Sequence, residues 1–290
     1  LGGPNRTTTV TGPLGDLVAA AWRLDRRSAS GSLAGSLTAV VEMALASGLD
    51  LVGGAGANDP VAATSSGTGE LMAAAVDAGA RRVVVGVGGS ASTDGGLGAV
   101  RALEPLARLH GVELVVACDV RTRFVDAAAV FAPQKGASPA QVELLRRRLE
   151  RLADVYLRSY GLDVRELEGG GAAGGLAGGL AAAGARLVPG FDLVADEVDL
   201  ADRLVDADLV VTGEGFLDEQ SFAGKVVGGV AGLAGAAGVP VLAVVGEVLD
   251  GVDLPAGVEV VSLVAEVGDE RARGETVAAV EEVVGRRLAE

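Results

Sequence analysis

The sequence is short of cysteine, histidine and aromatic residues, and each shortage argues against a class of protein. Its 290 residues include one cysteine, Cys118, and one histidine, His110, while aromatic residues make up 3%. A single cysteine cannot form an intrachain disulfide, which fits a reducing cytosol. One histidine cannot build a multi-histidine metal site, and His110 lies at an expected helix end, which disfavours a Ser-His-Asp triad.

Positive charge is also scarce, since the formal net charge is −15. This charge disfavours nucleic acids and anionic membranes as partners. The first ten residues lack the basic and apolar regions of a signal peptide, so we expect a cytoplasmic protein. The longest uncharged run, residues 226–246, contains several glycines and Pro240 and predicts a buried helix followed by a strand rather than a membrane span. Apolar residues make up 49% of the chain, so Ala, Val, Leu and Gly must form a core of the parallel α/β type.

Lysine is nearly absent, because two lysines, Lys135 and Lys225, accompany 22 arginines. Both lysines lie in glycine-containing turns, where a compact ammonium group can reach a phosphate. Chance survival at surface positions is the alternative. If the lysines are functional, we expect exposed ammonium groups facing a cleft between domains. Lys→Arg changes should then lower kcat/KM and leave the melting temperature unchanged.

The order of predicted elements favours an α/β fold in two parts. Residues 7–11 and 17–24 read as an antiparallel hairpin with a Gly-Pro turn. Apolar patterns predict further strands at 38–42, 82–85 and 112–117, helices at 43–48, 71–78 and 140–158, and a buried helix within the Gly/Ala tract 169–184. The last ninety residues resemble βα units, with strands at 208–212, 241–245 and 258–263, a loop at 213–218, and helices at 226–237 and 275–288.

The stretch 83–98 is the first candidate site, because a valine strand runs into a loop rich in glycine and hydroxyl groups and then into a helix. Such loops collect backbone N–H groups that hold an anion. The candidate anion-binding residues are Gly88, Gly89, Ser90, Ser92 and Thr93. Asp94 could hold a metal ion beside the anion, and Asp119 follows a strand at the edge where open α/β folds bind ligands. A tight turn without function is the alternative.

The second candidate site is the stretch 212–225, which carries Glu214, Asp218 and Lys225. Acids and one lysine among glycines suit phosphoryl transfer: the lysine offsets phosphate charge, one acid can hold Mg²⁺, and another can accept the hydroxyl proton. A solvated polar loop is the alternative. The sequence lacks a P-loop and a dinucleotide-binding fingerprint.

Six motifs in register, spread from Val10 to the C-terminal region, resemble the type 1 glycerate kinase family. The motifs are VTGPLG (10–15), VEMALASG (41–48), SGTGE (66–70), GVGGSASTDGG (86–96), FAPQKG (131–136), and TGEG (212–215) followed by Asp218 and Gly224-Lys225. The resemblance implies ATP-dependent phosphorylation of glycerate, to 2-phosphoglycerate, with ATP, Mg²⁺ and glycerate as the ligands. It adds Ser66, Thr68 and Gln134 to the expected substrate- or phosphate-binding residues, and Lys135 to the catalytic ones.

The resemblance also implies two different α/β domains, one flavodoxin-like with a parallel sheet and one mixed, with the active site in the cleft between them. We expect a mixed domain at 1–200 and, at 201–290, the C-terminal part of the flavodoxin-like domain, whose N-terminal part is expected outside this chain. The family's Asp-Ser-Phe-Lys and Asp-Gly-Gly-Glu-Gly loops do not occur here. Its Asn-Pro-Leu loop is replaced by 121–126, and Phe216 and Ala223 stand where an arginine and a histidine are usual. A catalytically weakened relative that binds a small anion or nucleotide as a sensor or subunit is the alternative. The sequence leaves open the 2- or 3-phosphoglycerate product and the monomer or homodimer.

Overall fold

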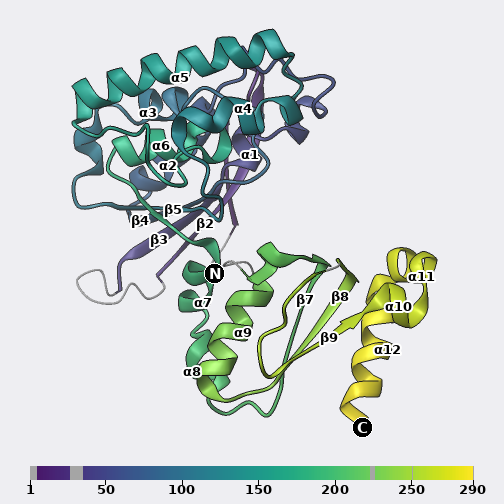
Figure 1. Cartoon of the computed structure of the whole chain (residues 1–290). Coiled ribbons are helices and arrows are strands. Elements are labelled where there is room, and N and C mark those ends of the chain that lie inside the picture. The colour runs from purple at the N-terminus through teal and green to yellow at the C-terminus, as the bar shows by residue number, and fades with distance from the viewer. Residues whose placement is uncertain (1–4, 27–34, 223–225, 250, 290) are drawn as a thin grey trace. The chain divides into compact units, whose positions relative to one another are not determined.

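The computed structural model describes residues 5–26, 35–222, 226–249 and 251–289. The chain forms two compact units, Leu1–Gly190 and Phe191–Glu290, and each is described by itself (Figure 1). The domain boundary expected at residues 200 and 201 stays a prediction.

The first unit is built on a six-stranded sheet in which the strands follow one another in chain order. The strands are β1 (Asn5–Thr11), β2 (Leu17–Asp25), β3 (Leu37–Glu42), β4 (Ala80–Gly86), β5 (Glu113–Ala117) and β6 (Arg186–Val188). The pairs β1–β2 and β2–β3 are antiparallel, whereas the pairs from β3 to β6 are parallel. The predicted hairpin and the mixed character of this part are therefore confirmed.

The helices of the first unit gather on one side of this sheet, with α5 outermost (Figure 1). They are α1 (Ala44–Ser47), α2 (Ser66–Asp77), α3 (Leu97–Leu103), α4 (Ala127–Phe131), α5 (Pro139–Tyr160) and α6 (Ala172–Ala182). The start of α5 is fixed by Ser138 and Gln141, which form a reciprocal capping box, with Pro139 in the first turn. Gly161 ends the helix in a left-handed conformation (φ 78°), as is common after a helix C-terminus.

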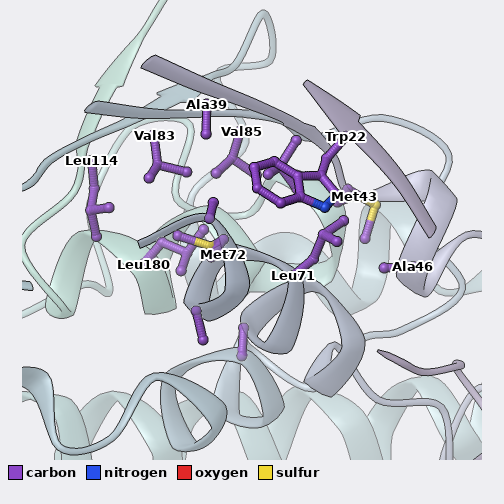
Figure 2. Close-up of a cluster of buried hydrophobic side chains, with 14 of the residues drawn as sticks. Trp22, Ala39, Met43, Ala46, Leu71, Met72, Val83, Val85, Leu114 and Leu180 are labelled. Carbon is purple, nitrogen blue, oxygen red and sulfur yellow. The ribbon is translucent and has the colours of Figure 1, made fainter. Parts of the chain in front are cut away.

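The main core lies between the sheet and the first layer of helices (Figure 2). Trp22, Val83 and Leu114 from the strands belong to the same buried cluster as Met72 of α2 and Leu180 of α6. A second cluster lies under α5 and contains Phe124, Leu145, Leu149, Leu152 and Tyr156. The first unit therefore has two apolar clusters, one against the sheet and one under α5.

The second unit contains a parallel three-stranded sheet in the order β7–β8–β9. Its elements are α7 (Gly190–Glu197), α8 (Leu200–Leu204), β7 (Val210–Leu217), α9 (Val226–Ala237), β8 (Val241–Val248), β9 (Val258–Ser262), α10 (Leu263–Val267), α11 (Asp269–Gly274) and α12 (Thr276–Ala289). The predicted parallel βα character is confirmed.

One expectation for this unit is wrong, since residues 213–217, read as a loop, continue β7. Their ladder to β8 runs from Gly213, paired with Val244, to Leu217, paired with Val248. A Cβ at Gly213 would lie 2.2 Å from the oxygen of Val244, so this glycine permits a close approach between strands rather than a turn.

The long uncharged run divides as predicted, into α9 and β8. Within the described ranges, no helix combines the length and apolar character that a membrane span requires.

Candidate active site

Lys135 is the centre of the candidate site in the first unit. Its Nζ donates to Ser90 Oγ and to the carbonyl oxygen of Ser92, both at 2.6 Å. Its side chain is buried, with 4% of the residue's surface exposed. Two of the three donors of a lysine ammonium are therefore engaged by the loop that follows β4.

The expectation of an exposed ammonium group is wrong for Lys135, which is buried. The turn Pro133–Lys135 is packed against the segment near Asn58, whose side-chain amide donates to the carbonyl oxygens of Lys135 and Ala91 at 2.9 and 3.1 Å. Gly136 follows in a left-handed conformation (φ 93°), and a Cβ there would lie 2.3 Å from the oxygen of Ala55. This close packing of the turn leaves the lysine inside.

Burial changes the acid–base behaviour of Lys135. Desolvation lowers the pKa of the Lys135 ammonium from 10.5 to about 7, and the negative charge of Asp94 partly opposes this effect. Near neutral pH the group therefore holds its proton only part of the time. A ligand anion in contact with Nζ would favour the charged form.

A cavity of about 240 Å³ opens beside Lys135. Four residues predicted from the sequence line it: Gly89, Ser90, Gln134 and Lys135. Its remaining walls are apolar and come from Leu49, Val87, Val120, Phe131, Ala172 and Ala173. The cavity thus combines a buried lysine and a hydroxyl group with mainly apolar walls; we call it the Lys135 pocket.

A left-handed stretch of backbone presses against the same loop. Ala173, Gly174 and Gly175 have φ values of 51°, 68° and 91°. A Cβ at Gly174 would lie 2.2 Å from the oxygen of Ser92 and 3.0 Å from Lys135 Nζ, so no side chain fits there. The sequence pattern does not predict this contribution, because the Gly/Ala tract 169–184 is typical of a buried helix. The adjacent glycines 174 and 175 were the available signal.

Asp94 joins three segments of the first unit through five hydrogen bonds among the described residues. Its carboxylate accepts from the N–H groups of Ser65, Gly96 and Gly98 and from the hydroxyl groups of Thr64 and Ser65. These bonds hold the site loop to the starts of α2 and α3. A metal-binding role for Asp94 stays a prediction.

The other hydroxyl residues predicted for the site have different surroundings. Thr68 Oγ1 donates to Ser47 Oγ at 2.9 Å, and Ser66 Oγ lies 2.8 Å from Thr64 Oγ1, so both connect α2 to neighbouring segments. The buried hydroxyl groups of Ser92 and Thr93 have no hydrogen-bond partner among the described residues. None of these four lines the Lys135 pocket; their binding roles, like that of Gly88, stay predictions.

Asp119 follows the carboxyl end of β5, as expected, and is exposed. Its Oδ1 accepts from the backbone N–H of Gly190 at 2.6 Å, so it is bonded to the last residue of the first unit. The described residues include no group of three or more His, Cys, Asp or Glu side chains that could hold a metal ion.

In the second unit, Glu214 lies on β7 and lines a cavity of about 710 Å³. Its Oε1 is buried, and none of the described residues provides it with a hydrogen-bond partner. Asp218 Oδ1 accepts from the N–H of Ser221 at 2.9 Å and from its hydroxyl at 3.2 Å, in the turn that precedes α9. Lys225, the remaining predicted residue, lies outside the described residues.

The fold and the Lys135 pocket define an α/β protein that offers a buried cation and a hydroxyl-rich loop to a small ligand. The chain belongs to the glycerate kinase family, whose model matches residues 1–105 and 104–287. The resemblance drawn from the six motifs is thereby confirmed.

Individual relatives agree with this assignment. The chain is 38% identical to the glycerate 2-kinase of Escherichia coli K12, over 94% of this chain and 79% of that protein. It is 43% identical to a protein of Mycobacterium bovis over 85% of this chain, and spans 65% of that relative's length. A crystal structure of a candidate glycerate kinase 2 from Salmonella typhimurium LT2 matches 98% of this chain and 84% of its own, with a TM-score of 0.74 and 36% identity.

Proposed function

We propose that this protein transfers a phosphoryl group from ATP to glycerate, with Mg²⁺, to give 2-phosphoglycerate. Support comes from the family and from relatives that carry the names glycerate kinase and glycerate 2-kinase. The observation that carries the proposal is Lys135, a buried lysine with two hydrogen bonds to the site loop.

The Lys135 pocket suits glycerate better than a nucleotide. A volume of about 240 Å³ accommodates a three-carbon acid and is too small for ATP as a whole. The carboxylate of glycerate would pair with the ammonium of Lys135, and Ser90 and Gln134 would offer hydrogen bonds to its oxygens. Burial strengthens this pairing, because opposite charges attract more strongly where water is excluded.

The carboxylates of the second unit are assigned to the phosphoryl transfer. When bound, Mg²⁺ would neutralise charge on the phosphate groups of ATP. Glu214 fits a cation because its buried Oε1 lacks a hydrogen-bond donor among the described residues, whereas the oxygens of Asp94 already accept from five donors. With Glu214 assigned to the cation, Asp218 would accept the proton of the glycerate hydroxyl, and Lys225 keeps its predicted role at the phosphates. In this proposal the protein is cytoplasmic and carries out the reaction there.

The test is a coupled ADP assay on the purified protein with ATP, Mg²⁺ and D-glycerate, together with calorimetry of glycerate binding. The parent should form ADP and 2-phosphoglycerate. Ser90→Ala should raise the KM for glycerate by about tenfold. Ser159→Ala removes an exposed hydroxyl group on α5 and should leave KM and kcat unchanged.

Two results separate the proposal from its alternatives. If the parent binds glycerate without turnover, and Lys135→Met abolishes this binding, the sensor or subunit hypothesis is favoured. The absence of both binding and turnover would refute glycerate as the ligand of this pocket.

A further inference from the structure

A second cavity of the first unit, of about 380 Å³, lies under α5. It is bounded by α5, by the segment 61–63, by the start of α3 and by Thr93 and Asp94. The Lys135 pocket is lined by Gly89 and Ser90 of the same loop, and the two cavities share no lining residue. We call this second cavity the α5 cavity.

The lining of the α5 cavity is mainly apolar and includes two arginines of α5 and the polar residues Thr93 and Asp94. Leu145, Leu149 and Leu152 of α5 form much of its wall. Arg148 and Arg151 also line it and are exposed, so they place positive charge at its solvent side. Arg148 donates to the carbonyl oxygen of Val61 at 2.8 Å, while no ion pair involving Arg151 occurs among the described residues. An anionic group with an apolar body is complementary to this arrangement.

Thr93 also lines the cavity, beside Asp94. It is 1% exposed, and its hydroxyl group has no hydrogen-bond partner within the described part of the chain. Leaving a buried hydroxyl group unpaired is costly. A ligand atom that forms a hydrogen bond with this hydroxyl group would remove that cost.

We propose that the α5 cavity binds a small organic acid with an apolar body, its carboxylate at Arg151 and a hydroxyl group at Thr93. The aliphatic walls take the body of the ligand, and Arg151 and Thr93 fix its direction. A cavity of this size lies within the usual range for small-molecule sites.

The packing of α5 connects this cavity to the Lys135 pocket. A Cβ at Gly95 would lie 2.5 Å from Leu152 Cδ2 and 2.9 Å from Leu149 Cδ2, and Tyr156 donates its hydroxyl to the oxygen of Gly95 at 2.9 Å. The same loop bonds Lys135 through the carbonyl oxygen of Ser92. An acid between α5 and the loop therefore shifts the contacts of Lys135, and the two ligands alter each other's affinity by the same factor. This coupling rests on the proposed function, whereas binding to the α5 cavity does not.

The experiment uses 4-hydroxyphenylacetate and phenylacetate as probes in isothermal calorimetry with the purified protein. We expect 4-hydroxyphenylacetate to bind with a submillimolar Kd, and phenylacetate to bind several-fold more weakly because it lacks the hydroxyl group. In Thr93→Val the two probes should bind equally. Arg151→Gln should weaken both about five- to tenfold.

Two tryptophan variants provide a matched pair. Val155 lines the cavity and is 40% exposed, whereas Leu144 lies on the same helix outside the cavity and is 43% exposed. Val155→Trp should reduce probe affinity at least about tenfold, and Leu144→Trp should leave it unchanged. Both proteins should keep the melting temperature of the parent within a few degrees.

The results distinguish this inference from the proposed function. Probe binding that Val155→Trp removes supports the α5 cavity even if the protein does not phosphorylate glycerate. Where glycerate does bind, 4-hydroxyphenylacetate should change its Kd several-fold in the parent and leave it unchanged in Val155→Trp. The absence of probe binding up to about 10 mM, or equal binding by the parent and Val155→Trp, would overturn the inference.

Discussion

The burial of Lys135 predicts an unusual dependence of stability on pH. In the folded protein the pKa of Lys135 is lowered to about 7, mainly by desolvation, from the ordinary 10.5. Between these two values the unfolded chain binds more protons than the folded protein. Stability should therefore rise as the pH increases from about 7 towards about 10, and this lysine should contribute least below pH 7, where its charged form must be buried.

The pKa shift sets the size of the effect. A change from 10.5 to about 7 corresponds to at most about 4–5 kcal/mol lost to the buried charge at low pH. Between about pH 7 and pH 9, roughly 2 kcal/mol of this loss should be recovered. The bonds to Ser90 Oγ and to the oxygen of Ser92 can persist throughout, because a neutral amine still donates two N–H groups.

The measurement is urea denaturation of the parent, Lys135→Met and Lys135→Arg at several pH values. Contributions from the other titrating groups cancel in the difference in unfolding free energy between the parent and Lys135→Met. This difference should shift in favour of the parent by roughly 2 kcal/mol from about pH 7 to pH 9. Lys135→Arg buries a charge that cannot be released, beside Gly174, where space is lacking. We expect it to lose about 3–5 kcal/mol, which replaces the earlier expectation of an unchanged melting temperature. A parent–Met difference that stays constant with pH would refute this reasoning.

Three further predictions concern single substitutions. Gly174→Ala should cost at least about 2 kcal/mol of unfolding free energy by urea denaturation, because steric overlap adds to backbone strain; Gly184→Ala, with strain but open space, should cost less, and equal losses would contradict the overlap. Ser138→Ala removes the cap of α5 and should lower stability by about 1 kcal/mol, whereas Ser159→Ala should change it little in the same assay. Glu214→Gln should raise the Mg²⁺ concentration for half-maximal activity about tenfold with the KM for glycerate unchanged; an unaltered Mg²⁺ dependence would remove Glu214 from the metal site.

Much of the fold could be predicted because apolar periodicity and local signals agreed. The apolar spacing of residues 140–158 predicts α5, and the valine-rich patterns predict β4, β5 and β8. The sequence does not predict the extension of β7, because Gly213 and Gly215 resemble a turn. Their role depends on contacts with β8, such as the approach of Gly213 to Val244, and such long-range contacts leave no local pattern.

The sequence predicts which residues belong to the candidate site, but it does not predict the burial and contacts of those residues. Scarcity of lysine singled out Lys135, and the loop motif singled out Ser90, which proves to be its hydrogen-bond partner. The burial of Lys135 depends on Asn58 and on the backbone near Ala55, far away in the sequence. Composition and spacing carry no information about such contacts, so the lowered pKa could not be anticipated.

The five hydrogen bonds to Asp94 also have an entropic consequence. They join the start of α2, the loop after β4 and the start of α3, so the loop that carries Ser90 and Ser92 is ordered by folding itself. A loop that becomes ordered only on binding loses about 1 kcal/mol or more per residue in backbone entropy. In this protein the backbone entropy of the loop is lost during folding, before the ligand binds. A small anion with few contacts can then be held by one lysine and a few hydrogen bonds, because none of their free energy is consumed in ordering the chain.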